Sequence, residues 1–221
     1  MSDPRATLAQ LVADTLREAI HNGQIACGER LIELAIAQSH NVSQNTVRDA
    51  LRRLENEGWV RYEARHGVRV RSFDAGEAEE VFALMATVEQ LAVGWVFDDH
   101  KRAQLLAALT PPVARARDEH NVGQIALRRK ALFGFHAALL ALTGRSQTQA
   151  LLRTLHNQAY LLTTDFETHA ESYTHHFEQL EGYEHLLGML KFGSSAEIQS
   201  TLFARILADG RPIVRWLAMH T

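Results

Sequence analysis

The chain has 221 residues, of which 46% are apolar and 22% charged. This balance is typical of a globular protein and excludes intrinsic disorder. Its single cysteine, Cys27, excludes an internal disulfide framework. The sequence shows no secretory leader pattern and no apolar run of about 18 residues. We therefore expect a cytoplasmic protein with no membrane partner.

The net charge of −3 hides a local basic stretch. Residues 1–72 carry ten Lys and Arg against nine Asp and Glu, whereas the remainder carries thirteen against seventeen. Within residues 48–71 there are seven arginines and only four acidic residues. A local basic stretch of this kind is what a nucleic-acid-binding surface requires.

The N-terminal third of the chain predicts three helices and a hairpin. Apolar residues at three- and four-residue spacing give way to a period of two after Gly58, and Ser43 is suited to cap the third helix. The expected helices cover 7–22, 32–38 and 43–57, and the expected strands cover 59–63 and 68–71. Three helices followed by a hairpin predict a winged helix-turn-helix over residues 1–72.

The third predicted helix has the composition of a DNA-recognition helix. Val47, Leu51 and Leu54 share its apolar face, which leaves polar side chains on the other side. Arginine pairs with guanine, and asparagine or glutamine pairs with adenine, while hydroxyls and a helix N-terminus suit phosphates. The predicted DNA-binding residues are Ser43, Gln44, Asn45, Thr46, Arg48 and Arg52, with Arg65, His66 and Gly67 at the hairpin tip.

From residue 77 onward the sequence predicts only helices. The expected ranges are 77–97, 101–109, 112–119, 122–143, 147–163, 167–178, 180–191, 195–208 and 212–219. The breaks at Pro111-Pro112 and at Gly210-Arg211-Pro212 are expected because proline disrupts a helix interior. The predicted fold class is mostly α: a winged helix over 1–72, a linker over 73–76 and an all-helical domain over 77–221.

Residues 7–72 resemble the DNA-binding domain of the GntR family of bacterial transcription regulators. The matching stretches are Gly28-Glu29-Arg30-Leu31, Ile36-Ala37, Val42-Ser43, Val47-Arg48-Asp49-Ala50-Leu51-Arg52-Arg53-Leu54, Glu57-Gly58-Trp59-Val60 and His66-Gly67. The sequence departs from the family's usual Pro, Arg and Pro at Cys27, Gln44 and Thr46. The resemblance implies a homodimer on a palindromic double-stranded operator, most often as a repressor released by a metabolite.

The remainder of the chain resembles the helical effector domain of the FadR subgroup, the FCD domain. That resemblance implies a small-molecule effector, often a carboxylate held by a metal on one Asp and three His. His136 and His185 stand at the expected separation of 49 residues, but leucines replace the Asp and the last His. Met85 replaces the subgroup's arginine, and Glu89 is kept. The implied effector pocket comprises Met85, Glu89, Leu132, His136, His185 and Leu207.

Two interpretations of this pocket remain open. In the first, which we favour, the pocket has no metal or other cofactor and binds a more apolar effector. In the second, a divalent metal such as zinc or nickel remains on His136 and His185 with substitute ligands. The substitutes would come from His156, His169, His175 or His176.

Two other functions are weighed against a transcription regulator. The twelve histidines suggest, as an alternative, a small helical metal-dependent enzyme with an accessory winged helix. The sequence has no HExxH, P-loop, GxGxxG or GxSxG motif, so we expect no enzyme. The third function is a protein-interaction module whose winged helix docks a partner. Affinity for duplex DNA that falls with salt distinguishes a regulator from such a module.

Overall fold

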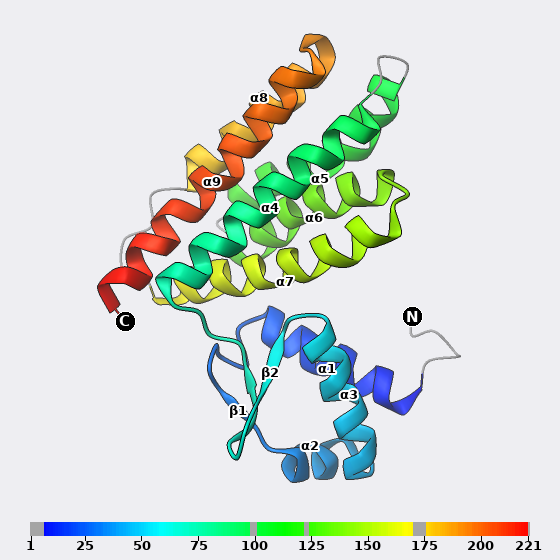
Figure 1. Ribbon diagram of the computed structural model, residues 1–221, viewed down its shortest axis with the longest axis vertical. Helices are drawn as coiled ribbons and strands as arrows, with labels where there is room; N and C mark the ends of the chain where they lie inside the picture. Colours follow the sequence, from blue (N-terminus) through cyan, green and yellow to red (C-terminus); the bar gives the residue numbers. More distant parts are fainter. Residues whose placement is uncertain (1–6, 98–100, 122–123, 170–175, 221) are drawn as a thin grey trace.

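The structure, a computed structural model, describes residues 7–97, 101–121, 124–169 and 176–220. Figure 1 shows two parts, a small N-terminal part with the sheet and a larger helical part. The first part contains α1 (Leu8–His21), β1 (Arg30–Leu31), α2 (Glu33–His40), α3 (Gln44–Asn56), β2 (Val60–Glu63) and β3 (Gly67–Val70). The second contains α4 (Ala75–Val96), α5 (Arg102–Asn121), α6 (Ile125–Leu142), α7 (Ser146–His169), α8 (His176–Phe192) and α9 (Ser195–His220).

The N-terminal part is a winged helix. Its antiparallel sheet has the order β1-β3-β2, and the β2–β3 hairpin runs from Val60 opposite Val70 to Glu63 opposite Gly67. The predicted apolar face of α3 is buried against α1 and the sheet. The predicted fold class is confirmed. Strand β1 was not predicted, because two residues are too few to show a period.

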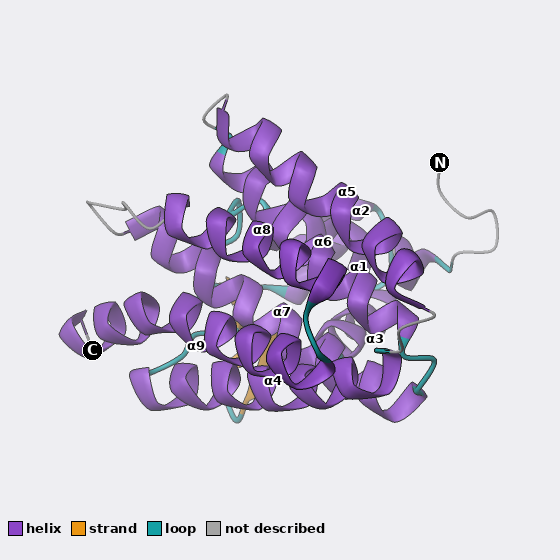
Figure 2. Ribbon diagram, turned by 90° about the horizontal axis from the view of Figure 1, so that it is seen from above, coloured by secondary structure: helices purple, strands orange, loops and turns teal. Residues whose placement is uncertain are grey.

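The helical part holds most of the buried apolar residues, which form one cluster with those of the winged helix. Helices α4 and α9 lie side by side in both Figure 1 and Figure 2, and they share the most extensive contact between two helices. Gly210 makes this approach possible, because a Cβ built there would lie only 2.5 Å from the Phe82 ring. Helix α7 lies nearest the winged helix in Figure 1. Among the described helices, none is both long and apolar enough to span a membrane.

The two predicted proline breaks are wrong. Helix α5 continues through Pro111 and Pro112, and α9 continues through Pro212. A proline inside a helix costs about 3 kcal/mol, and the contacts of α5 with α6 and α8, and of α9 with α4, offset that cost. The predicted helix over 167–178 is instead the end of α7 and the start of α8, and residues 170–175 lie outside the described residues.

The connection between the two parts is short. Helix α4 begins at Ala75, two residues before the predicted start. Asp74 caps it, since its carboxylate accepts from the Glu77 amide at 2.8 Å and Glu77 accepts from the Asp74 amide at 3.0 Å. Phe73 is buried beside this capping box. The connecting residues are therefore anchored at both the cap and the core.

Candidate DNA-binding surface and effector pocket

The N-terminal half of α3 presents an exposed polar surface. Gln44, Asn45 and Arg48 are exposed there. The Ser43 hydroxyl accepts from the Thr46 amide at 3.1 Å and bonds the Thr46 hydroxyl at 2.8 Å. The two hydroxyls thus order the helix N-terminus, whose remaining amides suit a phosphate.

The two arginines of this surface are held by weak surface ion pairs. The Nε of Arg48 donates to Glu33 at 2.8 Å, and its Nη1 donates to Asn45 at 3.4 Å. Arg52 lies 3.9 Å from Asp49, and its side chain is 71% exposed. Surface pairs of this kind contribute about 0–1 kcal/mol. Both guanidinium groups can therefore leave these carboxylates at little cost in free energy and pair with a nucleic acid.

The hairpin tip forms the wing. Arg65 and Gly67 adopt positive φ values of 69° and 84°, and Arg65, His66 and Gly67 are exposed. Figure 1 shows this tip and the α2–α3 turn at the end of the winged helix that lies away from the helical part. The predicted DNA-binding residues thus lie on α3 and the wing, at the free end of the domain.

A cavity lies in the core of the helical part, where α4, α6, α7, α8 and α9 converge. Its volume is about 40 Å³, enough for a few water molecules. The lining residues are Phe82, Met85, Arg128, Arg129, Leu132, Phe133, His136, Thr163, Glu167, Gln179, Tyr183, Ile206 and Asp209. Eight of these thirteen residues carry a polar group, so charged and apolar side chains both line the cavity.

The structure places three of the six predicted pocket residues in the lining: Met85, Leu132 and His136. Glu89 lies behind His136 and bonds to it. The other two do not line the cavity: His185 is exposed on α8 and Leu207 is half-buried on α9. Tyr183 and Asp209 occupy the lining instead. Tyr183 lies two residues before His185, and Asp209 lies two residues after Leu207. Two residues correspond to about 200° around a helix, so each pair occupies opposite faces.

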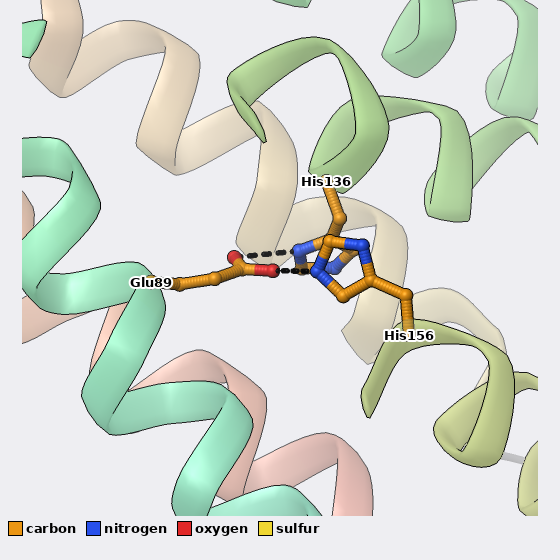
Figure 3. Close-up of side chains that lie close together, drawn as sticks. All are labelled: Glu89, His136 and His156. Carbon is orange, nitrogen blue, oxygen red and sulfur yellow. Dashed lines mark hydrogen bonds and ion pairs between the residues drawn. The ribbon is translucent and has the colours of Figure 1, made fainter. Parts of the chain in front are cut away.

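Glu89, His136 and His156 form a buried cluster (Figure 3). The Glu89 carboxylate, from α4, faces both imidazoles, with Oε2 2.8 Å from His136 Nδ1 and Oε1 2.5 Å from His156 Nε2. Burial acts to raise the pKa of Glu89, but the charge of His136 and the hydrogen bonds from both imidazoles hold that pKa at about 2. Glu89 is therefore a buried carboxylate whose two oxygens are both satisfied.

The cluster continues as a chain of polar contacts toward α9. His136 Nε2 lies 2.6 Å from the Tyr183 hydroxyl, which donates to Asp209 at 3.2 Å, and Arg205 donates to Asp209 at 2.6 Å. Burial raises the pKa of Tyr183 well above its ordinary value and also raises that of Asp209. A proton change at any member of this chain therefore alters its neighbours' bonding.

The residue types of the cluster suit a divalent metal, and the three ligand atoms lie within 4.8 Å of one another. Both Glu89 oxygens, however, already accept from an imidazole, so a metal would have to displace two N–H groups. The other named substitutes do not join the cluster. His169 pairs with Asp165 at 3.2 Å and is more than half exposed. His175 and the side chain of His176 lie outside the described residues.

Two buried arginines face the other side of the cavity. Arg128 and Arg129 are 1% and 5% exposed. Arg128 Nη2 donates to Glu167 at 3.0 Å, Arg129 Nη1 donates to the second Glu167 oxygen, and Arg128 Nη1 donates to Gln179 at 3.2 Å. Burial raises the pKa of Glu167, and the two guanidinium groups oppose that rise. Two buried cations therefore share one carboxylate.

Arg129 also connects the cavity to the winged helix. Its guanidinium lies 5.0 Å from the centre of the Tyr160 ring on α7. That ring stacks on His21 of α1 with centroids 3.5 Å apart, and Trp59 meets its edge at 6.3 Å. Nearby, the Asn157 side chain of α7 donates to the backbone carbonyl of residue 57 at 2.8 Å. Helix α7 thus contacts both this cavity and the winged helix.

Comparison with known proteins agrees with this arrangement. Residues 8–70 match the family described as bacterial regulatory proteins, gntR family. The N-terminal domain is therefore similar to the DNA-binding domains of that family. The chain is 34% identical over 90 residues to the HTH-type transcriptional regulator YdhC of Bacillus subtilis, a match covering 41% of this chain and 40% of that protein. The likeness to this curated relative therefore spans about two fifths of its length.

Two crystal structures resemble the chain over nearly its full length. One, described as a transcriptional regulator GntR from Rhodococcus sp. RHA1, is 25% identical with a TM-score of 0.78, covering 93% of this chain and 96% of that one. The other, McbR/YncC of Escherichia coli, is 19% identical with a TM-score of 0.78, covering 96% and 98%, and shows the shared fold. The family match over residues 8–70 and the Bacillus subtilis relative support a role in DNA-binding transcription regulation.

Several residues of the cavity and of the junction between the two domains were not predicted from the sequence. The buried pair Arg128 and Arg129 stands in a mostly apolar helix, and that contrast is the one local feature by which the sequence marks the pair. Tyr183 and Asp209 could have been found only with the correct helix phase. The His21–Tyr160 stack joins residues 139 positions apart, and no local pattern marks such a pair.

Proposed function

We propose that this protein is a transcription regulator that binds a palindromic operator through α3 and the wing, and that it works in the cytoplasm. The observation that carries the proposal is the exposed surface at the free end of a GntR winged helix, where Gln44, Asn45, Arg48 and Arg52 are all accessible. Arginine and amide side chains at the start of a recognition helix have the chemistry that reads base edges.

The test selects binding sites from a pool of random 30-base-pair duplexes and measures affinity for the selected duplex by fluorescence anisotropy. Arg48→Ala is expected to abolish specific binding while leaving the fold intact, because Arg48 makes only surface contacts. Arg115→Ala removes a cation that is 67% exposed on α5 and serves as the matched control. Unchanged affinity of Arg48→Ala at fixed salt contradicts the proposal.

A second measurement separates DNA binding from docking of a protein partner. The logarithm of the affinity is expected to fall linearly with the logarithm of salt concentration, since phosphate contacts release counterions. Glu33→Gln frees Arg48 from its ion pair and is expected to keep or strengthen DNA binding. A complex that is insensitive to salt would favour the protein-interaction module.

We propose that the regulator is a homodimer and that α4 supplies part of the contact. Leu84, Val88, Leu91 and Trp95 follow one another at spacings of four, three and four residues. Three of them are exposed, at 45% for Leu84, 51% for Leu91 and 37% for Trp95. A stripe at this spacing is the kind of helix surface that packs against a second helix, and a two-fold partner would match a palindromic site.

Sedimentation velocity tests the dimer directly. The wild-type protein is expected to sediment as a dimer, and Leu91→Glu is expected to weaken the association by placing a charge in the stripe. Leu151→Glu is the control, because Leu151 is equally exposed, at 51%, but lies on α7. Equal effects of the two substitutions, or a wild-type monomer, would contradict the proposed interface.

We further propose that a small-molecule effector binds in the cavity of the helical domain and changes the affinity for the operator through α7. The cavity is small in this conformation, so an effector would have to widen it or remain small itself. Arg129 touches both the cavity and Tyr160, and Tyr160 contacts the winged helix. An effector changes operator affinity only if it prefers one of these arrangements over another.

We propose that the cavity holds no resident metal or other cofactor. The support is the pairing of both Glu89 oxygens with imidazoles and the leucine at position 132, where the subgroup has a carboxylate ligand. Elemental analysis of untagged protein tests this. One zinc or nickel ion per chain would contradict the proposal of a metal-free cavity and would favour the alternative of a metal-dependent enzyme.

A further inference from the structure

A second cavity lies between the two domains, and among the described residues only Phe133 lines both this cavity and the proposed effector cavity. Its volume is about 510 Å³, within the roughly 300–1,000 Å³ usual for small-molecule sites. Helices α6 and α7 provide most of its lining, and His21 at the end of α1 provides the rest. The GntR domain and the helical domain therefore both line this cavity.

The charged lining of the interdomain cavity is cationic. Lys130 on α6 and Arg153 on α7 are exposed, and neither has an ion-pair partner within the described part of the chain. None of the lining residues is acidic. Burial, followed by the charges of Lys130, Arg129 and Arg17, lowers the pKa of His21 to about 4. The cavity therefore has a positive field that no side chain in its lining neutralises.

The remaining lining is largely apolar and partly aromatic. Ala137, Leu140 and Ala141 repeat along one face of α6, and the small alanine side chains leave space beside the helix. Tyr160 adds an aromatic wall where its ring stacks on His21. Walls of this kind suit a ligand with a flat hydrophobic ring.

We propose that the interdomain cavity binds an organic anion with a flat apolar body. Lys130 and Arg153 contact its charged group, and the alanine face of α6 contacts its ring. Carboxylates, sulfonates and phosphate esters share the required charge. Every residue that lines the effector cavity belongs to the helical domain, whereas a ligand in the interdomain cavity touches both domains and strengthens their contact.

The test uses the full-length protein and 8-anilino-1-naphthalenesulfonate, with N-phenyl-1-naphthylamine as a probe that keeps the rings but lacks the charge. Binding of both is followed by fluorescence titration. Lys130→Gln combined with Arg153→Gln is expected to weaken the sulfonate about ten-fold or more and the neutral probe far less. Ala137→Trp is expected to block both probes, because Ala137 lines the cavity and is exposed enough to accept a larger side chain.

The matched control is Arg115→Gln combined with Arg211→Gln, which removes two exposed cations away from the cavity and is expected to change neither affinity. Thermal unfolding of each variant verifies the fold. Sulfonate binding that survives Ala137→Trp, or that both double variants weaken equally, overturns the proposal. Competition by 1-naphthoate and 1-naphthyl phosphate then distinguishes a carboxylate ligand from a phosphate ester. None of these measurements involves DNA, so their failure leaves the proposed function untouched.

Discussion

Replacing Glu167 by Gln removes the one carboxylate that Arg128 and Arg129 share. All three side chains are at most 5% exposed. At an effective dielectric constant near 20, each ion pair contributes roughly 4–5 kcal/mol of attraction, and desolvation offsets much of it. Removing one partner of a buried pair costs about 3–5 kcal/mol. For a chain of this length, that free energy corresponds to a fall in Tm of roughly 6–20 °C.

Circular dichroism at 222 nm during heating measures this change. Glu119→Gln is the matched control: it breaks the Arg115–Glu119 pair at 3.8 Å, in which the arginine is 67% and the glutamate 20% exposed, and it is expected to lower the Tm by less than about 2 °C. If Glu167→Gln unfolds within 2 °C (about 0.5–1 kcal/mol) of this control, the buried carboxylate does not hold the two arginines and the reasoning is wrong.

The same variant tests what the effector cavity can bind. Glu167→Gln leaves two buried cations beside a cavity of about 40 Å³, a size that suits formate. Formate at ten times its Kd would restore about 1.4 kcal/mol, seen as a rise in the Tm of the variant but not of the wild type. Sodium chloride at the same concentration is the control for ionic strength. An equal rise with both salts would show no specific anion site.

Three further predictions concern other parts of the molecule. Because the pKa of folded His21 is about 4 against 6.5 unfolded, its contribution to stability is present above pH 6.5 and lost as the pH falls toward 4. In urea titrations, His21→Phe is expected to reduce the fall in the free energy of unfolding between pH 6.5 and pH 4 by roughly 1–2 kcal/mol. An unchanged slope of that free energy with pH would contradict this expectation. Gly210→Ala is expected to cost about 1–2 kcal/mol, because its Cβ would meet the Phe82 ring, whereas Gly188→Ala, with open space around it, is expected to stabilise by roughly 0.5–1 kcal/mol. Chelation with EDTA is expected to leave the Tm unchanged, and a fall would show that the Glu89 cluster holds a structural metal.

The winged helix was predictable from the sequence because its signals are local. The change of apolar period after Gly58, the cap at Ser43 and the apolar face of α3 each depend on residues close together in the chain. The cavity was predictable only in part. Of the two histidines that we expected at an effector pocket, His136 lines the cavity and His185 does not, because an error of two residues in helix phase moves a side chain to the opposite face.

Helix continuity was the other point at which sequence reasoning failed. Pro111, Pro112 and Pro212 carry a strong local preference for a break, and the packing of α5 and α9 overrides it. The contacts responsible join segments far apart in the sequence, as Gly210 and Phe82 show. Local propensity describes the cost of such a helix but not the contacts that offset it.

The junction between the domains restricts how this protein could be rebuilt as a chimera. At Gly58 the backbone φ is +86°, and a Cβ there would lie 2.9 Å from Thr154 and 3.2 Å from Gln158. Its neighbour Trp59 and the more distant His21 meet the ring of Tyr160. A winged helix transplanted onto a foreign sensor domain would lose these fitted partners. A functional hybrid therefore needs the α7 surface to be transferred together with the winged helix. The fusion point between the two proteins should then lie within the helical domain rather than at residue 74.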